Sequence, residues 1–157
     1  MTTKSSPGLP SDVTAVLAEL SPEDAADLAA LYDDYHVWAG RDTDRVAAAI
    51  EGSDVAVGLR EAATDRLVAA ARAVTDGAYY ASVYDVVVAE ARRGEGLGEE
   101  LLAAVVDHDA LGDVPRVNAA CREGLTDFYA GCGFERSRES VKHDGREEDL
   151  VHMVYHR

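Results

Sequence analysis

Three glycines at positions 94, 96 and 98 constrain the fold most, because they separate an apolar run from an amphipathic segment. The run at residues 86–88 is typical of a buried strand, whereas residues 99–108 have the spacing of a helix. A helix that begins at such a loop exposes its first N–H groups, which have no partner within the helix. The helix dipole favours negative charge at the same end. The stretch 92–98 therefore predicts a site for a phosphate or pyrophosphate group.

Other glycine loops fit the sequence less well. A P-loop has a lysine followed by serine or threonine after its last glycine, and Glu99 and Glu100 stand there instead. A dinucleotide-binding fingerprint has Gly-x-Gly-x-x-Gly early in a βαβ unit, whereas this loop reads Gly-x-Gly-x-Gly and lies beyond mid-chain. A plain strand-to-helix turn is the structural alternative. Such a turn needs neither three glycines nor the cationic donors of Arg92 and Arg93.

Length and composition are those of a globular domain. The 157 residues suffice for one domain with a substantial core, and 47% of them are hydrophobic. Residues 1–10 are polar and lack the apolar segment of a signal peptide, so we interpret them as a flexible tail and residues 11–157 as the folded domain. No apolar run approaches 18 residues, so no membrane association is expected. We therefore predict a cytoplasmic protein.

The charge of the chain is strongly negative. Thirty acidic residues against fifteen basic ones give a net charge of −15, and only Lys4 and Lys142 are lysines. This bias is typical of proteins from salt-loving cells, where a Debye length of about 3 Å at 1 M salt screens self-repulsion. We therefore predict an acidic protein from a halophile. No basic stripe indicates a nucleic-acid partner, and a cationic substrate is compatible with the acidity.

Apolar periodicity predicts alternating strands and helices along the domain. Strands are expected at residues 13–20, 54–60, 67–75, 79–88, 114–121, 136–142 and 150–156. Helices are expected from Ser21 to a break at Gly40, and over residues 42–50, 99–108 and 125–132. The second to fourth strands should form an antiparallel meander, and the fifth should return parallel to the fourth. The expected fold class is α+β, a mixed and mostly antiparallel sheet of six to seven strands flanked by about four helices.

This element order, with the glycine loop after the fourth strand, resembles the GCN5-related N-acetyltransferase (GNAT) superfamily. Arg93-x-x-Gly96-x-Gly98 matches the family's Arg/Gln-x-x-Gly-x-Gly/Ala signature for acetyl-CoA. The segment from Phe128 to Phe134 is similar to its Phe-Tyr-x-x-x-Gly-Phe segment, at the right distance from the loop. The resemblance covers residues 13–156. It extends to a subgroup that acts on small molecules.

The resemblance implies how acetyl-CoA would be bound as cosubstrate. In the family the fourth strand splays from the fifth, so backbone groups of Val86 and Val88 would pair with the pantetheine. The N–H of Val87 or Val88 would polarise the acyl carbonyl. Glu95 stands where a basic residue often contacts the phosphates. The pyrophosphate cradle implied by the family consists of Arg93, Gly94, Glu95, Gly96, Leu97 and Gly98.

The resemblance also implies an enzyme that moves an acetyl group to a primary amine by direct attack in a ternary complex. Tyr129 is the candidate general acid, because a phenol with a pKa of about 10 is protonated at neutral pH. Its structural alternative is a core tyrosine. Asp85 interrupts an apolar strand and is the candidate base; alternatively it is a structural carboxylate bonded to a loop or to Arg72. Glu123 or an ordered water are further candidates for the base.

The acceptor site is less well defined by the sequence. Tyr32, Tyr35 and Trp38 lie where the family places its acceptor-binding wall, with Glu123 as a further candidate, and Trp38 would stack on a cation. Packing in the core is the alternative for the tyrosines. We expect a small-molecule amine as partner, no metal, and a homodimer, since dimers are common in the family. A catalytically idle acyl-CoA sensor is the alternative function.

Overall fold

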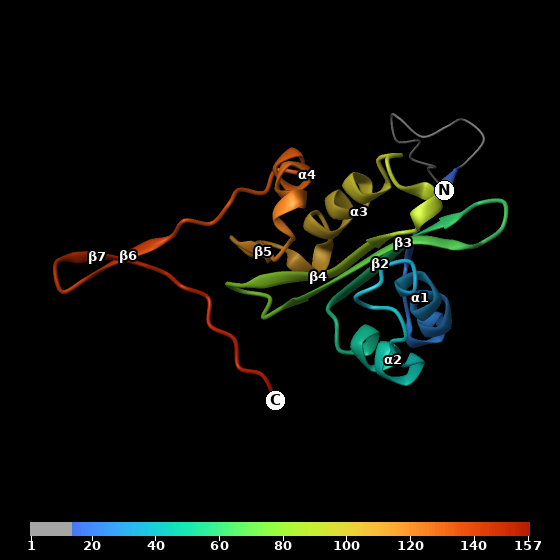
Figure 1. Ribbon diagram of the computed structural model, residues 1–157, viewed down its shortest axis with the longest axis horizontal. Coiled ribbons are helices and arrows are strands. Elements are labelled where there is room, and N and C mark those ends of the chain that lie inside the picture. The colour runs from blue at the N-terminus through green and yellow to red at the C-terminus, as the bar shows by residue number, and fades with distance from the viewer. Residues whose placement is uncertain (1–13) are drawn as a thin grey trace. The chain divides into compact units, whose positions relative to one another are not determined.

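The computed structural model describes residues 14–157, which fall into two compact units (Figure 1). The first unit ends at Ala120, and the second runs from Cys121 to Arg157. The expected tail at residues 1–10 and the expected strand residue Val13 lie outside the described residues. No helix within residues 14–157 has the length and apolarity needed to cross a bilayer.

The first unit is built on a five-stranded sheet with the strand order β1-β2-β3-β4-β5. Its strands are β1 (Ala15–Glu19), β2 (Val55–Glu61), β3 (Leu67–Thr75), β4 (Ala81–Val88) and β5 (Val117–Ala119). Its helices are α1 (Ala25–Tyr32), α2 (Thr43–Glu51) and α3 (Leu97–Val106). All neighbouring strands are antiparallel except β4 and β5, which are parallel. The expected meander and the parallel return are therefore confirmed.

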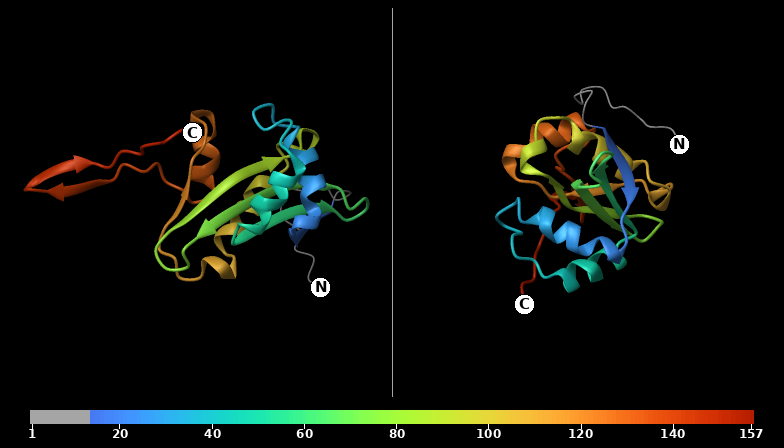
Figure 2. Two further views of the ribbon diagram at one scale, coloured as in Figure 1. Left: turned by 90° about the horizontal axis from the view of Figure 1, so that it is seen from below. Right: turned by 90° about the vertical axis from the view of Figure 1, so that its right-hand side faces the viewer.

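Helices cover both faces of this sheet. Figures 1 and 2 show α1 and α2 on one face and α3 on the other. Leu101, Leu102 and Val105 of α3 are fully buried, and burying each such side chain contributes about 1.5–3 kcal/mol. Five consecutive residues of β3, from Leu67 to Ala71, are also buried. A strand that is covered on both faces reads as a continuous apolar run, which is why β3 shows no alternation.

The first helix is shorter than its periodicity predicted. It ends at Tyr32, and residues 33–40 form successive turns, so the extension to Gly40 is wrong. The backbone N–H of Gly40 donates to the carboxylate of Asp33 at 2.9 Å, which closes this loop on the helix end. The second helix begins as expected, because the side chain of Asp42 caps it by accepting the backbone N–H of Arg45 at 3.3 Å.

The second unit contains α4 (Thr126–Gly131), β6 (Ser140–His143) and β7 (Arg146–Asp149). The two strands form a sheet of their own, so the seven strands within residues 14–157 divide into five and two. The expected last strand at residues 150–156 is misplaced. Asp144 and Gly145 have φ values of 49° and 76°, which suits a two-residue hairpin turn, and His143 pairs directly with Arg146. The return strand therefore begins four residues earlier than predicted.

Candidate functional site

Strand β4 continues beyond the last of its residues that pairs with β5. The last pair between the two strands is Val83 with Ala119. The N–H of Ala89 donates to β3 at 2.7 Å, and backbone groups of alternate residues point to the same side. Val86 and Val88 therefore direct their backbone groups away from β3, as the splayed-strand expectation requires. The Val88 carbonyl already accepts from Nε of Arg93 at 3.3 Å, which leaves it less suited to an external ligand than expected.

The glycine loop presents an open surface at the start of α3. Gly94 and Gly96 have φ values of 81° and 80°, a left-handed conformation that other residues rarely adopt. A Cβ added at either position would meet nothing within 4 Å, so backbone conformation and not crowding requires glycine there. Leu97 and Gly98 begin the helix and are buried. The first N–H groups of α3 thus lie beside an uncrowded loop, an arrangement that suits a diphosphate.

The two arginines of the loop bind the protein itself. Arg92 is only 8% exposed, and its guanidinium contacts the carboxylates of Glu61 at 2.7 Å and Glu95 at 2.5 Å. Arg93 donates to the backbone carbonyl of Asp34 at 3.0 Å in addition to that of Val88. The expectation that Arg92 serves as a donor at the loop surface is therefore wrong. Its contact with Glu95 offsets part of the charge of a carboxylate that would otherwise repel an anion.

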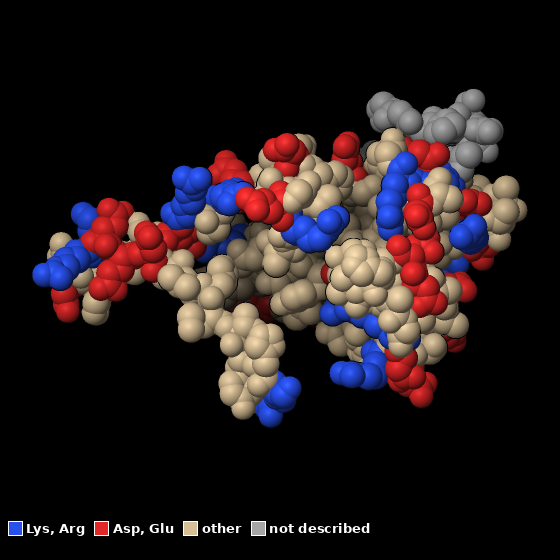
Figure 3. All heavy atoms as spheres, in the orientation of Figure 1, with Lys and Arg blue, Asp and Glu red and all other residues tan. Residues whose placement is uncertain are grey.

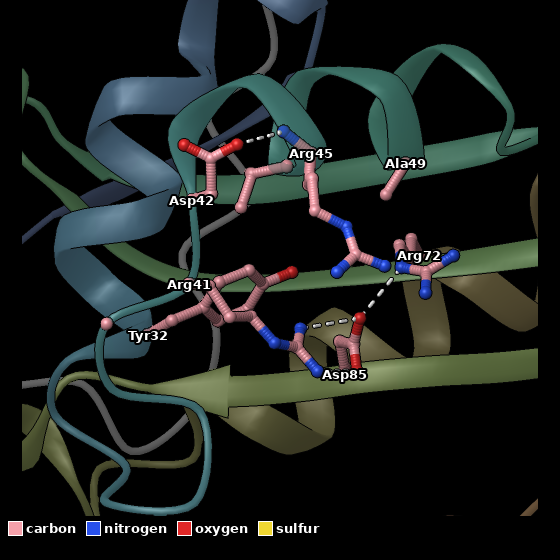
Figure 4. Close-up of a pocket in the computed structure, with 9 residues that line it drawn as sticks. Tyr32, Arg41, Asp42, Arg45, Ala49, Arg72 and Asp85 are labelled. Carbon is pink, nitrogen blue, oxygen red and sulfur yellow. Dashed lines mark hydrogen bonds and ion pairs between the residues drawn. The ribbon is translucent and has the colours of Figure 1, made fainter. Parts of the chain in front are cut away.

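A cavity of about 470 Å³ lies between α1, α2 and the sheet of the first unit (Figure 4). Its wall combines side chains of two helices, two strands and the turn before α2. It is lined by Tyr32, Gly40, Arg41, Asp42, Arg45, Val46, Ala49, Arg72 and Asp85. The wall holds three guanidinium groups, although the chain has a net charge of −15.

A β-bulge directs Asp85 into this cavity. Arg72 pairs with Tyr84 and Ala70 with Val87, so one residue of β3 opposes two residues of β4. Asp85 has a φ of 55°, which aspartate tolerates better than most residues. Its carboxylate contacts Nε of Arg72 at 2.8 Å and Nη1 of Arg41 at 3.0 Å. The pairing with Arg72 matches the structural alternative, and the role of catalytic base stays a prediction.

The aromatic residues expected at the acceptor site form a cluster around Arg41. The Arg41 guanidinium lies 4.8 Å from the ring centre of Tyr32 and 4.9 Å from that of Trp38. The ring of Tyr35 packs edge-on against Trp38 at 4.7 Å and does not line the cavity. Trp38 therefore stacks on a cation of the protein itself. Of the three residues, only Tyr32 forms part of the cavity wall.

Burial fixes the protonation state of Tyr32. It raises the pKa of the phenol to about 12; the nearby Asp85 carboxylate also raises it, whereas Arg41 and Arg72 lower it. Tyr32 is 3% exposed and stays protonated at neutral pH, so its hydroxyl can donate a hydrogen bond. Figure 4 shows this side chain beside the guanidinium groups of the cavity.

Tyr129 and Glu123 belong to the second unit. Tyr129 lies on α4, half-buried, with its ring edge-on to Phe128 at 5.3 Å and to Phe134 at 5.6 Å. Burial, and then the thiols of Cys121 and Cys132, raise the pKa of Tyr129 above its usual value. The phenol is therefore protonated at neutral pH, as a general acid must be. Glu123 is exposed at the start of the turn before α4.

Sequence reasoning missed the cationic side of the cavity. Arg41 and Arg45 are four residues apart, but Arg41 precedes α2 and Arg45 lies in its first turn, so helical spacing did not place them together. Arg72 was named from the sequence only as an alternative partner of Asp85, and the expected pairing of their two strands favours this contact. Within residues 14–157, no group of three or more His, Cys, Asp or Glu residues is arranged to hold a metal ion.

Comparison with known proteins supports the resemblance. A histone acetyltransferase of Glycine max is 29% identical over 128 residues, covering 76% of this chain and 55% of that protein. Glucosamine 6-phosphate N-acetyltransferase 1 of Oryza sativa subsp. japonica is 36% identical over 93 residues, covering 55% of this chain and 56% of that protein. The chain therefore spans only a little over half the length of these relatives.

The structural comparison and the family model give the same assignment. A solved structure from Xanthomonas campestris pv. campestris, assigned to the GNAT family, superposes with a TM-score of 0.63 at 27% identity. The superposition covers 83% of this chain and 88% of that one. The family model described as "Acetyltransferase (GNAT) domain" matches residues 30–156, which include the glycine loop, the cavity residues and α4. The chain belongs to the GNAT acetyltransferase family.

Proposed function

We propose that this protein is an acetyl-CoA-dependent N-acetyltransferase that acetylates a primary amine by direct attack in a ternary complex. One observation supports this proposal above others: the β4 end with outward backbone groups leads directly into the glycine loop and α3. Backbone donors in this order suit a ligand with amide groups followed by a diphosphate. Acetyl-CoA is such a ligand, and its thioester would supply the acetyl group and a thiol leaving group.

The donor side of the proposed site depends on backbone groups. N–H groups of the loop from Gly94 to Gly98 would bind the diphosphate, and the ion pair with Arg92 reduces the repulsion from the nearby Glu95 carboxylate. The outward N–H group of Val86 would hold the pantetheine arm. An N–H group close to the acyl carbonyl, at Val88, would stabilise the negative charge that develops on its oxygen. Val87 is less suited, because its backbone groups face β3.

Two proton transfers complete the proposed reaction. The attacking amine must lose a proton as the C–N bond forms, and the departing sulfur must gain one as the C–S bond breaks. Tyr129 would protonate the sulfur, since burial keeps its phenol protonated. Asp85 is engaged by two guanidinium groups, which favours Glu123 or a water as the acceptor of the amine proton.

A small-molecule acceptor is proposed because the cavity of about 470 Å³ has the size of a small-ligand site. The rice relative, by its name, acetylates the amine of a phosphorylated sugar. The soybean relative is named for histones, so a protein amine is the competing acceptor class. Protein and small-molecule amines therefore belong in the same screen.

The test is release of CoA thiol from acetyl-CoA across a panel of amines, in high and low salt. We expect Tyr129→Phe to lower kcat about 100-fold while stabilisation of the protein by CoA is unchanged. Tyr79→Phe, at an exposed tyrosine of the hairpin between β3 and β4, is the matched control and should leave kcat unchanged. CoA binding without thiol release from any amine would instead support an acyl-CoA sensor.

A further inference from the structure

We propose that the acceptor amine carries an anionic group, a carboxylate or a phosphate, which Arg45 binds in the cavity beside Arg41 and Arg72. The inference rests on the proposed acetyltransferase activity and names the class of its acceptor. It depends on the charges, partners and directions of the cavity side chains.

The charges of the cavity do not balance. Three arginines face two aspartates among the residues that line it. The Asp85 carboxylate is shared between Arg41 and Arg72, and the Asp42 carboxylate accepts the backbone N–H of Arg45 in the first turn of α2. Among the described residues, no carboxylate contacts the guanidinium of Arg45. One positive charge of the cavity is thus left for a ligand.

The direction of the Arg45 side chain agrees with a positive charge that is left for a ligand in the cavity. Figure 4 shows its side chain extending from α2 toward Arg72 and Asp85, on the opposite side of the cavity from Arg41. A guanidinium presents two parallel N–H donors, which match the two oxygens of a carboxylate or phosphate. The protonated hydroxyl of Tyr32 lines the same space and supplies a further donor.

The net negative charge of the protein would favour a cationic ligand. The charges within the cavity therefore determine which kind of ligand binds there. Figure 3 shows acidic side chains spread among basic ones over the visible surface. Within the cavity, the ammonium of a cationic ligand would meet guanidinium groups, and Asp85 is already held by two of them. A ligand with an anionic end avoids this repulsion. At high ionic strength, short bidentate contacts persist when long-range attraction is screened.

The cavity also lies next to the proposed donor site. Asp85, in its wall, is followed directly by Val86, the first residue whose backbone would hold the pantetheine. An anion anchored at Arg45 would therefore leave the amine of the same molecule free to reach the end of β4. Anchoring by a group that does not react contributes to the KM of the amine more than to kcat.

The test compares amines that differ only in the anionic group. β-Alanine is matched with β-alaninamide for the carboxylate arm, and phosphoethanolamine with ethanolamine for the phosphate arm. We expect kcat/KM to be about 10–100-fold higher for the anionic member of at least one pair, as charge-assisted hydrogen bonds require. The arm with the larger ratio identifies the anion.

Variants of Arg45 assign the effect to the cavity. Arg45→Gln should remove most of the preference by raising the KM of the anionic amine about tenfold, with kcat nearly unchanged. Arg45→Lys keeps the charge without the paired donors and should restore the preference in part. Arg66→Gln, at an exposed arginine between β2 and β3 outside the cavity, should leave it intact.

Two outcomes would overturn the inference in distinguishable ways. Efficient thiol release with β-alaninamide and ethanolamine, at rates equal to their anionic partners and unaffected by Arg45→Gln, would remove the anion from the acceptor but keep the acetyltransferase. No thiol release from any amine, with Arg45-dependent binding of phosphate or acetate to the CoA-saturated protein by calorimetry, would show an anion site that serves no acceptor.

Discussion

The glycine loop and the arginine cavity of the first unit treat charge in opposite ways. In the loop, one buried guanidinium, that of Arg92, lies between the carboxylates of Glu61 and Glu95. In the cavity, one carboxylate, that of Asp85, lies between the guanidinium groups of Arg41 and Arg72. In the loop, Arg92 is bound by carboxylates of the protein, and only backbone N–H groups are available to a ligand. In the cavity, the side chain of Arg45 is available to a ligand.

The two regions also differ in how the chain builds them. The loop is seven consecutive residues whose conformation depends on local backbone angles, with φ near 80° at Gly94 and Gly96. The cavity brings together side chains from residues 32 to 85, carried by two helices and two strands. A donor site made from backbone can be shared across a family, while a cavity made from side chains can change its ligand by single substitutions.

The largest expected effect comes from removing the carboxylate that two guanidinium groups share in the cavity. Asp85→Asn should lower the free energy of unfolding by about 3 kcal/mol, because it leaves two partly buried guanidinium groups without their shared carboxylate. Asparagine tolerates the positive φ at this position, so the backbone adds little to the cost. Urea denaturation of the variant and the wild type measures the difference.

The matching substitution in the loop, Glu95→Gln, should cost only about 1 kcal/mol, since Arg92 keeps its contact with Glu61. Asp113→Asn changes an exposed carboxylate near β5 and serves as the control, with no measurable effect. Equal losses for Asp85→Asn and Glu95→Gln would contradict the contrast between the two charge arrangements.

The next effect concerns the buried phenol of Tyr32 in the cavity wall and appears at high pH. The pKa of Tyr32 is about 12 in the folded protein against 10.0 as its ordinary value. The folded state therefore holds this proton more tightly, so its contribution to stability is complete below pH 10 and is lost as the pH rises toward 12. We expect a loss of about 2 kcal/mol between pH 10 and pH 12.

Tyr32→Phe isolates this contribution, because every other titrating group is common to the two proteins. Urea midpoints of wild type and variant, measured from pH 9 to pH 12, should show a steeper decline for the wild type. Parallel curves would show that Tyr32 titrates at its ordinary pKa and that water solvates its hydroxyl.

A similarly small effect on stability tests the role of the loop backbone. Gly96→Ala forces a methyl-bearing residue into the left-handed region and should cost about 1 kcal/mol. Gly77→Ala, in the turn between β3 and β4, has a φ of 74° and equally open surroundings, so it should cost the same. Only Gly96→Ala should weaken CoA binding, by about tenfold. A similar loss of CoA affinity in Gly77→Ala would mean that the loop has no special role.

The sequence predicted the parts of the molecule that depend on local pattern. Helix α2 lies within the expected range, with Asp42 as its cap, and Leu101 and Leu102 face the core because they share one side of an amphipathic helix. The return strand β7 was misplaced because the apolar residues 150–156 resembled a strand more than the charged residues 146–149 did. There the turn at Asp144 and Gly145 decided the pairing.

The arrangement of the cavity side chains could not be predicted from local sequence pattern. Its guanidinium groups meet only after β3 and β4 pair with a bulge, and nothing local to Asp85 marks that bulge. The stacking of Arg41 on Trp38 likewise depends on the turns that follow α1. A tryptophan that was expected to receive a cationic ligand therefore receives an arginine of the chain, and the chemistry of the cavity changes from cation to anion binding.

Two-substrate steady-state kinetics test the division between loop and cavity most directly. Acetyl-CoA and either phosphoethanolamine or β-alanine are varied with wild type, Gly96→Ala and Arg45→Gln. The structure predicts that Gly96→Ala raises the KM of acetyl-CoA alone and that Arg45→Gln raises the KM of the amine alone, each about tenfold. A rise in the KM of acetyl-CoA in Arg45→Gln, or of the amine in Gly96→Ala, would contradict it.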